Sequence, residues 1–314
     1  MILPSEKQPI YVIAGPTASG KTALGVALAL AVGGEVINCD SVQIYKEIQI
    51  ATAKPSDEEK RGVMHHLIDY VEPTVNYTAA DWARDAAKTI AEIESRGKTP
   101  ILVGGTGFYL RTLMRPLFES PPTDDLLRQR LRGIKEKHGA EYLHRMLQRV
   151  DPASAERLSP RDYIRVNRAL EVFFQTGHRL SERQNDRLPT PEFAKRIVLF
   201  VLEPPRAELY DKINRRTEMH FAAGLVDEVR HLRERGIADA TNALGSHGYR
   251  RVCEYLRDER SLESCMEQTK QDVRNYAKRQ LTWFRSEKGT IWLNGFGSDP
   301  AVIEAVLAKI TKNI

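Results

Sequence analysis

The sequence predicts an α/β fold, with a parallel sheet at its core, a mostly helical domain inserted into that core and a helical C-terminal part. Two observations support this prediction. Short apolar runs alternate with segments of helical periodicity, an order typical of a parallel sheet covered by helices on both faces. One long basic segment breaks the alternation, because its pattern is helical nearly throughout.

Four apolar runs are the main candidate strands. In chain order they are Ile10–Ala14, Glu35–Cys39, Pro100–Val103 and Ile197–Leu202, and a shorter run, Thr290–Leu293, is a fifth candidate. A helix is expected over Ala79–Arg96, because its apolar residues have helical spacing and Gly97 is a suitable C-cap. Beyond Pro205 the pattern is helical to about Ser286.

The excess of basic residues is concentrated in the segment from 120 to 196. The chain has 47 Lys and Arg against 42 Asp and Glu, a formal charge of +5, and this segment alone has 16 basic and 11 acidic residues. Prolines flank it, at Pro121-Pro122 and at Pro189 and Pro191. We therefore expect residues 1–119 and 197–314 to form the core and residues 120–196 a helical insertion. A basic module is typical of a nucleic-acid contact, although a solvated helical surface explains the charge equally well.

The composition indicates a cytoplasmic protein without a membrane segment. No apolar run approaches the roughly 18 residues of a membrane span, and Met1–Pro9 lacks the core of a signal peptide. The three cysteines, Cys39, Cys253 and Cys265, form no CxxC pair. This pattern is typical of reduced thiols and argues against disulfides or a structural zinc site.

The first turn of the core has a complete phosphate-binding motif. It consists of Gly15, Pro16, Thr17, Ala18, Ser19, Gly20, Lys21 and Thr22, which match G-x-x-x-x-G-K-[ST] between a strand and a helix. The glycines let several backbone N–H groups point at one phosphate, and the N-terminus of the helix adds partial positive charge. Lys21 is expected to bridge phosphate oxygens, and Thr22 to offer its hydroxyl to Mg²⁺. The motif predicts a core of the P-loop NTPase type and a phosphorylated ligand.

Asp40 is the acid expected to face this loop. It follows the second candidate strand, and ligands of open parallel sheets bind beyond the C-terminal ends of the strands. The third strand ends in Gly104-Gly105 instead of an acid, and no N-K-x-D guanine motif is present. The sequence alone leaves three roles open for Asp40: a general base, an N-cap, or a group that contacts Mg²⁺ through another ligand.

Seven segments, taken in order, match the pattern of a known family. They are Asp40–Lys46, Thr52–Pro55, His65–Asp69, Val103–Leu110, Arg168–Val172, Gly224–Val229 and Lys278–Arg285. Over essentially its whole length the chain therefore resembles the tRNA dimethylallyltransferase (tRNA isopentenyltransferase) family. It departs from the family pattern at Glu47–Ala51, where Gly-Met-Asp-Ile-Gly is usual, and at Ser246–Tyr249, where Ile-Gly-Tyr is usual.

The resemblance implies a prenyl transfer to tRNA. The family moves a dimethylallyl group from dimethylallyl diphosphate to the N6 amine of adenosine 37, next to the anticodon, and forms N6-isopentenyladenosine. In this chain Lys21, Thr22 and Arg216 would then hold the diphosphate with Mg²⁺, which stabilises the departing charge. Asp40 would accept the proton of the amine, and Thr106 would bind near that amine or a tRNA phosphate.

The resemblance also assigns contacts with the tRNA anticodon stem-loop. They fall at Asp40, Ser41, Val42, Gln43, Thr106, Arg128, Ile164, Arg165, Val166, Asn167 and Arg168. A helix predicted around Asp162–Phe174 would place Arg161, Arg165 and Arg168 within ~60° of one another, at ~100° per residue. The opposite, packed side would hold Tyr163, Val166, Leu170, Phe173 and Phe174. A solvated face is the alternative for each arginine.

Two other functions fit part of the sequence. A P-loop kinase of small molecules would use the same loop for ATP, Asp40 as its base and the helical insertion as a lid. An RNA-binding module with an inactive nucleotide site would explain the basic segment, but it leaves Lys21, Thr22 and Asp40 without a role. For the favoured function we expect the chain to act as a monomer.

Overall fold

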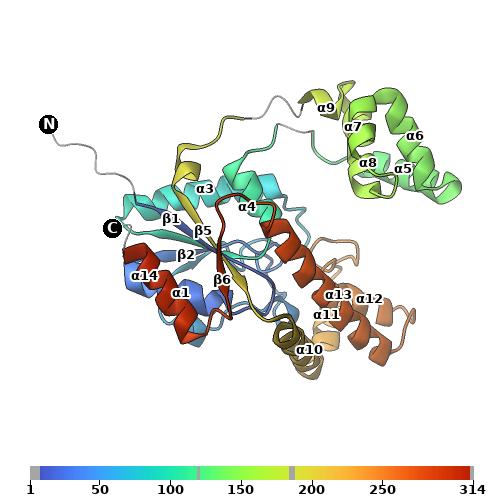
Figure 1. The fold of residues 1–314 in the computed structure, drawn as a ribbon. Coiled ribbons are helices and arrows are strands. Elements are labelled where there is room, and N and C mark those ends of the chain that lie inside the picture. Colours follow the sequence, from blue (N-terminus) through green and yellow to red (C-terminus); the bar gives the residue numbers. More distant parts are fainter. Residues whose placement is uncertain (1–7, 119–120, 184–187, 312–314) are drawn as a thin grey trace. The chain divides into compact units, whose positions relative to one another are not determined.

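The chain divides into two compact units, Met1–Met114 with Pro191–Ile314 and Arg115–Thr190. The computed structural model describes residues 8–118, 121–183 and 188–311 of the chain (Figure 1). The smaller unit overlaps most of the insertion expected over 120–196. It begins a few residues before position 120 and ends a few residues before position 196.

The larger unit is built on a six-stranded sheet in which every pairing of the described strands is parallel. The strands are β1 (Ile10–Ala14), β2 (Glu35–Asn38), β3 (His65–His66), β4 (Pro100–Gly104), β5 (Ile197–Glu203) and β6 (Ile291–Asn294), in the spatial order β3-β2-β4-β1-β5-β6. The predicted α/β class and parallel sheet are thus confirmed. The sequence did not predict β3, because its two histidines form no apolar run.

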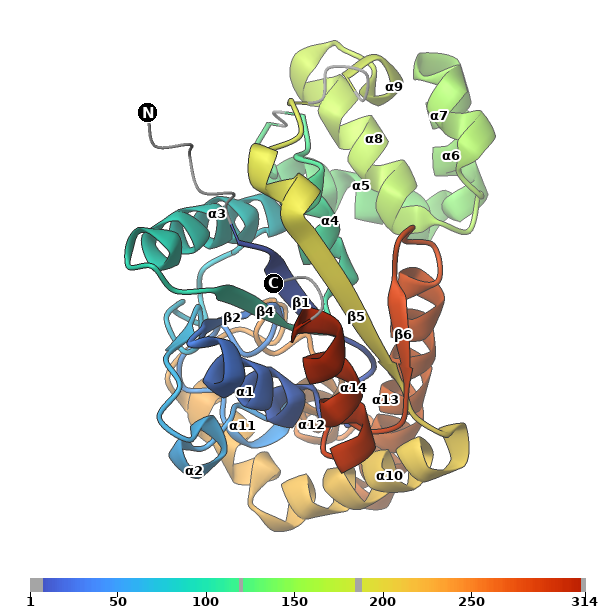
Figure 2. The ribbon, with the colours of Figure 1, turned by 60° about the vertical axis from the view of Figure 1, so that its left-hand side comes forward.

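Alternate residues of the strands face two separate apolar layers. In β1, Ile10 and Val12 belong to one buried cluster and Tyr11 and Ile13 to the other, because successive side chains of a strand point to opposite faces. The first layer is covered by α3 (Ala79–Ser95) and α4 (Gly107–Met114), and the second by α1 (Lys21–Val32) and α14 (Pro300–Thr311), as Figure 2 shows.

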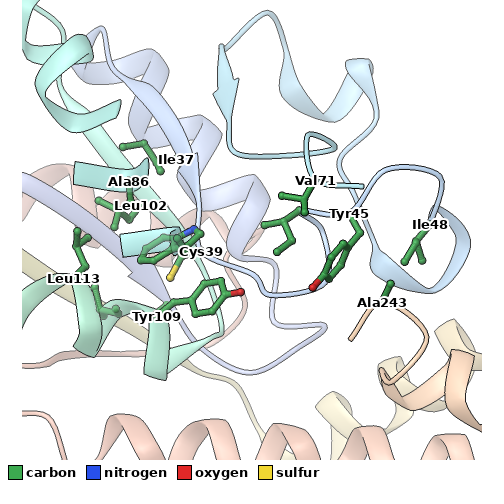
Figure 3. Close-up of a cluster of buried hydrophobic side chains, with 14 of the residues drawn as sticks. Ile37, Cys39, Tyr45, Ile48, Val71, Ala86, Leu102, Tyr109, Leu113 and Ala243 are labelled. Atoms are coloured by element: carbon green, nitrogen blue, oxygen red, sulfur yellow. The ribbon is translucent and has the colours of Figure 1, made fainter. Parts of the chain in front are cut away.

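The end of β2 is fixed by the layer that includes α3 and α4. Trp82 of α3 is fully buried, stacks on Tyr109 of α4 with ring centroids 4.9 Å apart, and donates a hydrogen bond of 2.9 Å to the carbonyl of Asn38. Cys39, the next residue, is buried beside Tyr109 (Figure 3). The packing and this hydrogen bond therefore fix the position of the backbone at the end of β2, just before Asp40.

Helices complete the larger unit. After β5 come α10 (Arg206–Ala222), α11 (Leu225–Glu234), α12 (His247–Tyr255) and α13 (Leu262–Phe284); shorter elements are η1 (Ile50–Thr52), α2 (Asp57–Lys60) and η2 (Glu192–Arg196). The predicted helical C-terminal part is confirmed. None of the helices in the described ranges combines the length and the apolar sequence needed to cross a bilayer.

The smaller unit has a core of its own. Its helices are α5 (Asp125–His138), α6 (Ala140–Val150), α7 (Pro152–Arg157), α8 (Tyr163–Thr176) and α9 (Leu180–Arg183). Leu131 of α5 and Leu143 of α6 pack with Val166 and Leu170 of α8. The unit therefore buries one apolar stripe of each of its longer helices.

Candidate active site

The phosphate loop lies between β1 and α1, as the motif requires. Gly20 has φ 84° and precedes the first residue of α1, and a Cβ atom on it would come within 2.9 Å of the backbone nitrogen of Gly297. Ser19 is buried, and its Oγ donates to the carbonyl of Pro16 at 2.8 Å. The first turn of α1 has no acidic residue, so the positive end of this helix is not neutralised.

Lys21 supplies a cation inside this loop. Its Nζ donates to the carbonyl of Pro16 at 2.7 Å. Burial lowers the pKa of Lys21 to about 8, against the opposing attraction of Asp40. The side chain therefore remains mostly charged at pH 7.

Asp40 follows β2 and turns back on its own chain. Its Oδ1 accepts hydrogen bonds from the backbone N–H groups of Val42, at 2.9 Å, and Gln43, at 3.3 Å. Among the described residues, none donates a hydrogen bond to its Oδ2. One oxygen of Asp40 thus holds the carboxylate in place, and the other is available to a ligand.

Thr106 is held against the same turn. Its N–H donates to the carbonyl of Cys39 at 3.1 Å, and its Oγ1 accepts from the N–H of Ser41 at 3.0 Å. The approach depends on Gly104, because a Cβ atom there would lie 2.0 Å from the carbonyl oxygen of Cys39. The ends of β2 and β4 therefore bring Asp40 and Thr106 together.

Arg216 reaches the phosphate loop from α10. Its guanidinium donates a hydrogen bond to Oγ1 of Thr17, across 199 positions of sequence. Burial lowers the pKa of Arg216, and the nearby charge of Asp40 opposes that shift. Arg216 and Lys21 thus place two cations beside one carboxylate.

Two cavities meet at these groups. The smaller, about 340 Å³, is lined by the phosphate loop, including Lys21 and Thr22. The larger, about 500 Å³, extends away from the loop. Thr17, Asp40 and Arg216 line both, so a ligand in one cavity can touch a ligand in the other at Asp40.

The larger cavity has a lining rich in aromatic and imidazole rings, which the sequence analysis did not identify. It includes Tyr45, Tyr77, Tyr109, His220, Phe221, His247 and Tyr276. Tyr45 and Tyr109 extend toward each other from opposite sides of the cluster in Figure 3. No local spacing could have revealed this set, because its members come from loops and helices across most of the chain.

The imidazoles of this cavity are neutral at pH 7. Burial, followed by the charge of Arg216, lowers the pKa of His220 to about 4. Burial, followed by the charge of Arg279, also lowers the pKa of His247. Burial raises the pKa of Tyr276, which stays protonated. The large cavity is therefore uncharged except where Asp40 and Arg216 border the smaller one.

The oxygen donors of the smaller cavity suit Mg²⁺. Thr22 and Asp40 both border it, and its described lining includes no His or Cys. Mg²⁺ usually takes one or two oxygen ligands from the protein and the rest from water and phosphates. Within the described ranges no group of three or more His, Cys, Asp or Glu could hold a metal alone. The residues therefore fit Mg²⁺ bound together with a phosphorylated ligand.

In the smaller unit, two arginines assigned to tRNA contacts converge on a buried carboxylate. Glu171 of α8 is fully buried. Its oxygens accept from Nε of Arg128 at 3.0 Å, from a guanidinium nitrogen of Arg168 at 2.7 Å and from the N–H of Asp124 at 2.9 Å. Arg168 also donates to the carbonyl of Pro121 at 2.8 Å. Both arginines thus have a structural role in this unit.

The run Ile164–Arg168 is divided between surface and core. Ile164 is 79% exposed, and the exposed Arg165 forms an ion pair of 3.1 Å with Asp162. Val166 is buried in the apolar core. Asn167 is buried too, and its Oδ1 has no hydrogen-bond partner in the described structure.

The single arginine face predicted for this helix is wrong. α8 begins at Tyr163 with Asp162 as its N-cap, so Arg161 lies outside it. Arg168 turns toward Glu171, because a buried carboxylate needs cationic partners. Phe174, expected on the packed side, is 48% exposed.

A P-loop that meets a carboxylate at the C-terminal edge of a parallel sheet is typical of enzymes of the P-loop class. A sequence profile described as IPP transferase matches residues 43–287, which is more than half of the chain. The chain therefore belongs to the IPP transferase family.

Individual relatives agree with this assignment. The chain is 45% identical to a tRNA dimethylallyltransferase of Geobacter metallireducens over 96% of this chain and 97% of the other. It is similar to the structure of a tRNA isopentenylpyrophosphate transferase of Bacillus halodurans, with 36% identity, a TM-score of 0.72 and coverage of 98% and 96%. A eukaryotic dimethylallyltransferase acting on tRNA matches with 29% identity, a TM-score of 0.75 and coverage of 97% and 77%.

Proposed function

We propose that this enzyme transfers the dimethylallyl group of dimethylallyl diphosphate to the N6 amine of adenosine 37 in tRNA, forming N6-isopentenyladenosine. Its family membership makes it a prenyltransferase that acts on tRNA. The donor, the accepting atom and the position in tRNA are parts of the proposal.

One observation carries the proposal: the two cavities share Thr17, Asp40, Thr52 and Arg216. The cavity at the phosphate loop fits a diphosphate, since it combines backbone N–H groups with Lys21. The larger cavity, with its aromatic lining, fits a dimethylallyl group and a purine. The bond that breaks and the bond that forms would then both lie beside Asp40.

On the donor side, the protein stabilises the leaving group. Carbon–oxygen cleavage leaves the negative charge on the diphosphate, where Lys21, Arg216 and the N-terminus of α1 offset it. When bound at the Thr22 hydroxyl and the diphosphate, Mg²⁺ would supply further positive charge.

On the acceptor side, Asp40 would take the proton that the N6 amine loses when it is alkylated. Its Oδ1 is held by two backbone N–H groups, and its Oδ2, which accepts no hydrogen bond from a described residue, would receive the proton. Thr106 supports this geometry, because its Oγ1 accepts from the N–H of Ser41, the residue after Asp40. An adenine can reach this point only when it is turned out of its stack, as in other enzymes that modify a base.

We place tRNA contacts on both units. In the larger one they fall at Ser41, Val42 and Gln43, which follow Asp40 directly. In the smaller one the exposed Arg161 and Arg165 would meet phosphates, while Arg128 and Arg168 would act mainly by holding α8 and its neighbours together.

A double-label experiment tests the proposal against a P-loop kinase. Unmodified tRNA is incubated with the enzyme and dimethylallyl diphosphate labelled in its five-carbon group, and in parallel with ATP labelled in its γ-phosphate. The proposal predicts that only the carbon label enters tRNA, and that Asp40→Asn slows this incorporation by about 10²–10⁴-fold. Incorporation of phosphate, or of neither label, would contradict it.

A further inference from the structure

Gln280 lies between the phosphate loop and the loop that contains Thr106. It is on α13, is 5% exposed, and is separated from Thr17 by 263 positions and from Gly105 by 175. Its Oε1 accepts a hydrogen bond of 2.8 Å from the N–H of Thr17, and its Nε2 donates one of 2.9 Å to the carbonyl of Gly105. One side-chain amide therefore joins two loops of the active site.

The chemistry of these two bonds requires an amide. An N–H of the phosphate loop needs an acceptor, and a carbonyl of the other loop needs a donor. A carboxylate would place two acceptors against each other at Gly105. An apolar side chain would leave the Thr17 N–H without its acceptor, and would leave the Gly105 carbonyl with only the N–H of Gly107, at 3.2 Å. Gly105 is part of the same fit, because a Cβ atom on it would lie 2.1 Å from Nε2 of Gln280.

The connection continues to Asp40 through one peptide group. The carbonyl of Gly105 and the N–H of Thr106 belong to the same peptide plane. Gln280 holds its carbonyl end, and the carbonyl of Cys39 accepts from its N–H end at 3.1 Å. Cys39 immediately precedes Asp40. A continuous series of hydrogen bonds thus runs from Thr17 in the phosphate loop to the base of the Asp40 turn.

We infer that Gln280 is a positioning residue, which fixes the distance and angle between the phosphate loop and Asp40 and so aligns the leaving group with the accepting amine. The inference rests on the proposed function for the identity of the two substrates. The requirement for alignment follows from the transfer itself, because a displacement of about 1 Å can reduce a rate by about 100-fold.

Three variants of the full chain separate the parts of this inference. Gln280→Glu has the same shape and keeps the acceptor for Thr17 but loses the donor to Gly105. Gln280→Met loses both. Gln271→Glu is the matched control, because Gln271 lies on the same helix with an exposed side chain.

Single-turnover rates with both substrates saturating are the first measurement. Gln280→Glu should lower the rate constant by roughly 10- to 100-fold, with tRNA affinity and the KM for dimethylallyl diphosphate within about threefold of wild type, as for an effect on alignment alone. Gln271→Glu should match wild type. A wild-type rate constant in Gln280→Glu, or a loss confined to KM, would overturn the inference.

A double-variant cycle then tests the route through Thr106. If Gln280 positions the Gly105–Thr106 peptide, it also positions Oγ1 of Thr106, which accepts from the N–H of Ser41. The losses in Gln280→Glu and Thr106→Ala should then be far from additive in the double variant. Additive losses would mean that Gln280 acts elsewhere. A merely structural role would lower the melting temperature without this coupling.

Hydrogen exchange at the Thr17 amide distinguishes a failure of this inference from a failure of the proposed function. The amide should exchange at the wild-type rate in Gln280→Glu and at least ~10-fold faster in Gln280→Met. If wild type transfers no label to tRNA, the proposed function fails, and this exchange still decides whether Gln280 restrains the phosphate loop. Equal exchange in all variants would refute the restraint.

Discussion

Replacing Arg168 with alanine is expected to loosen the smaller unit before it affects any contact with RNA. The guanidinium is bonded to the fully buried Glu171 at 2.7 Å and to the carbonyl of Pro121 at 2.8 Å. Its removal leaves Glu171 with Arg128 and the N–H of Asp124 as its remaining described partners.

The magnitude follows from these contacts. A hydrogen bond to a charged group contributes about 1.5–3 kcal/mol, and breaking a fully buried ion pair costs about 3–5 kcal/mol. Arg168 is 27% exposed and Glu171 keeps other partners, so we expect a loss of about 2–3 kcal/mol. The control is Arg165→Ala, whose ion pair with Asp162 is exposed and should contribute less than about 1 kcal/mol.

Amide hydrogen exchange of the α8 segment is the suitable assay, because the smaller unit has no tryptophan to report its unfolding. A loss of about 2–3 kcal/mol corresponds to roughly 30- to 150-fold faster exchange in Arg168→Ala. Arg165→Ala should stay within about fivefold of wild type. Equal exchange in the two variants would refute a structural role for Arg168.

Four further predictions follow from the site and the charges. Asp40→Asn should keep tRNA affinity and lower kcat by about 10²–10⁴-fold, measured by label transfer under saturation; unchanged turnover would exclude Asp40 as the base. Lys21→Ala should lower kcat/KM for dimethylallyl diphosphate by about 10- to 100-fold with tRNA affinity unchanged; an equal loss of tRNA affinity would mean that the loop binds RNA. A double variant with Arg161→Ala and Arg165→Ala should flatten the log–log salt dependence of tRNA affinity by about 0.7 per lost contact. Parallel salt plots for wild type and the double variant would mean that these side chains contact solvent and not tRNA. Burial opposes ionisation of Glu171, but bonds from Arg168, the Asp124 N–H and Arg128 outweigh it and hold its pKa below 4.5. Its contribution to stability is therefore complete above pH 4.5 and should be lost as the pH falls through its lower folded value; exchange of α8 that does not change with acid would contradict this.

The sequence predicted those parts of the fold and the site that depend on residues close together in the chain. The phosphate loop is specified by eight consecutive positions, and Asp40 by its place directly after an apolar strand. Arg216 required the family resemblance, because its bond to Thr17 joins residues 199 positions apart. Gln280 and the rings of the large cavity were missed for the same reason.

In the smaller unit, the helical pattern of the sequence alone was insufficient to predict which arginines are exposed. The spacing of Arg161, Arg165 and Arg168 indicated one exposed basic face that meets phosphate, or otherwise solvent. Arg168 instead turns toward the buried Glu171, because the charge of that carboxylate must be paired inside the unit. The sequence does show Glu171 among the apolar residues of this helix. Its partners could not be identified among the many arginines, however, because they are set by the packing of α5 against α8.

The location of the transferred group in tRNA is the most direct test of the central proposal. Unmodified tRNA is treated with enzyme and dimethylallyl diphosphate, digested with a base-specific nuclease, and its fragments are analysed by mass spectrometry. The account predicts one added C5H8 unit, confined to the fragment with adenosine 37 and released as N6-isopentenyladenosine, and none when that adenosine is replaced by guanosine. A five-carbon group on another nucleotide, or one retained in the guanosine-substituted tRNA, would contradict it.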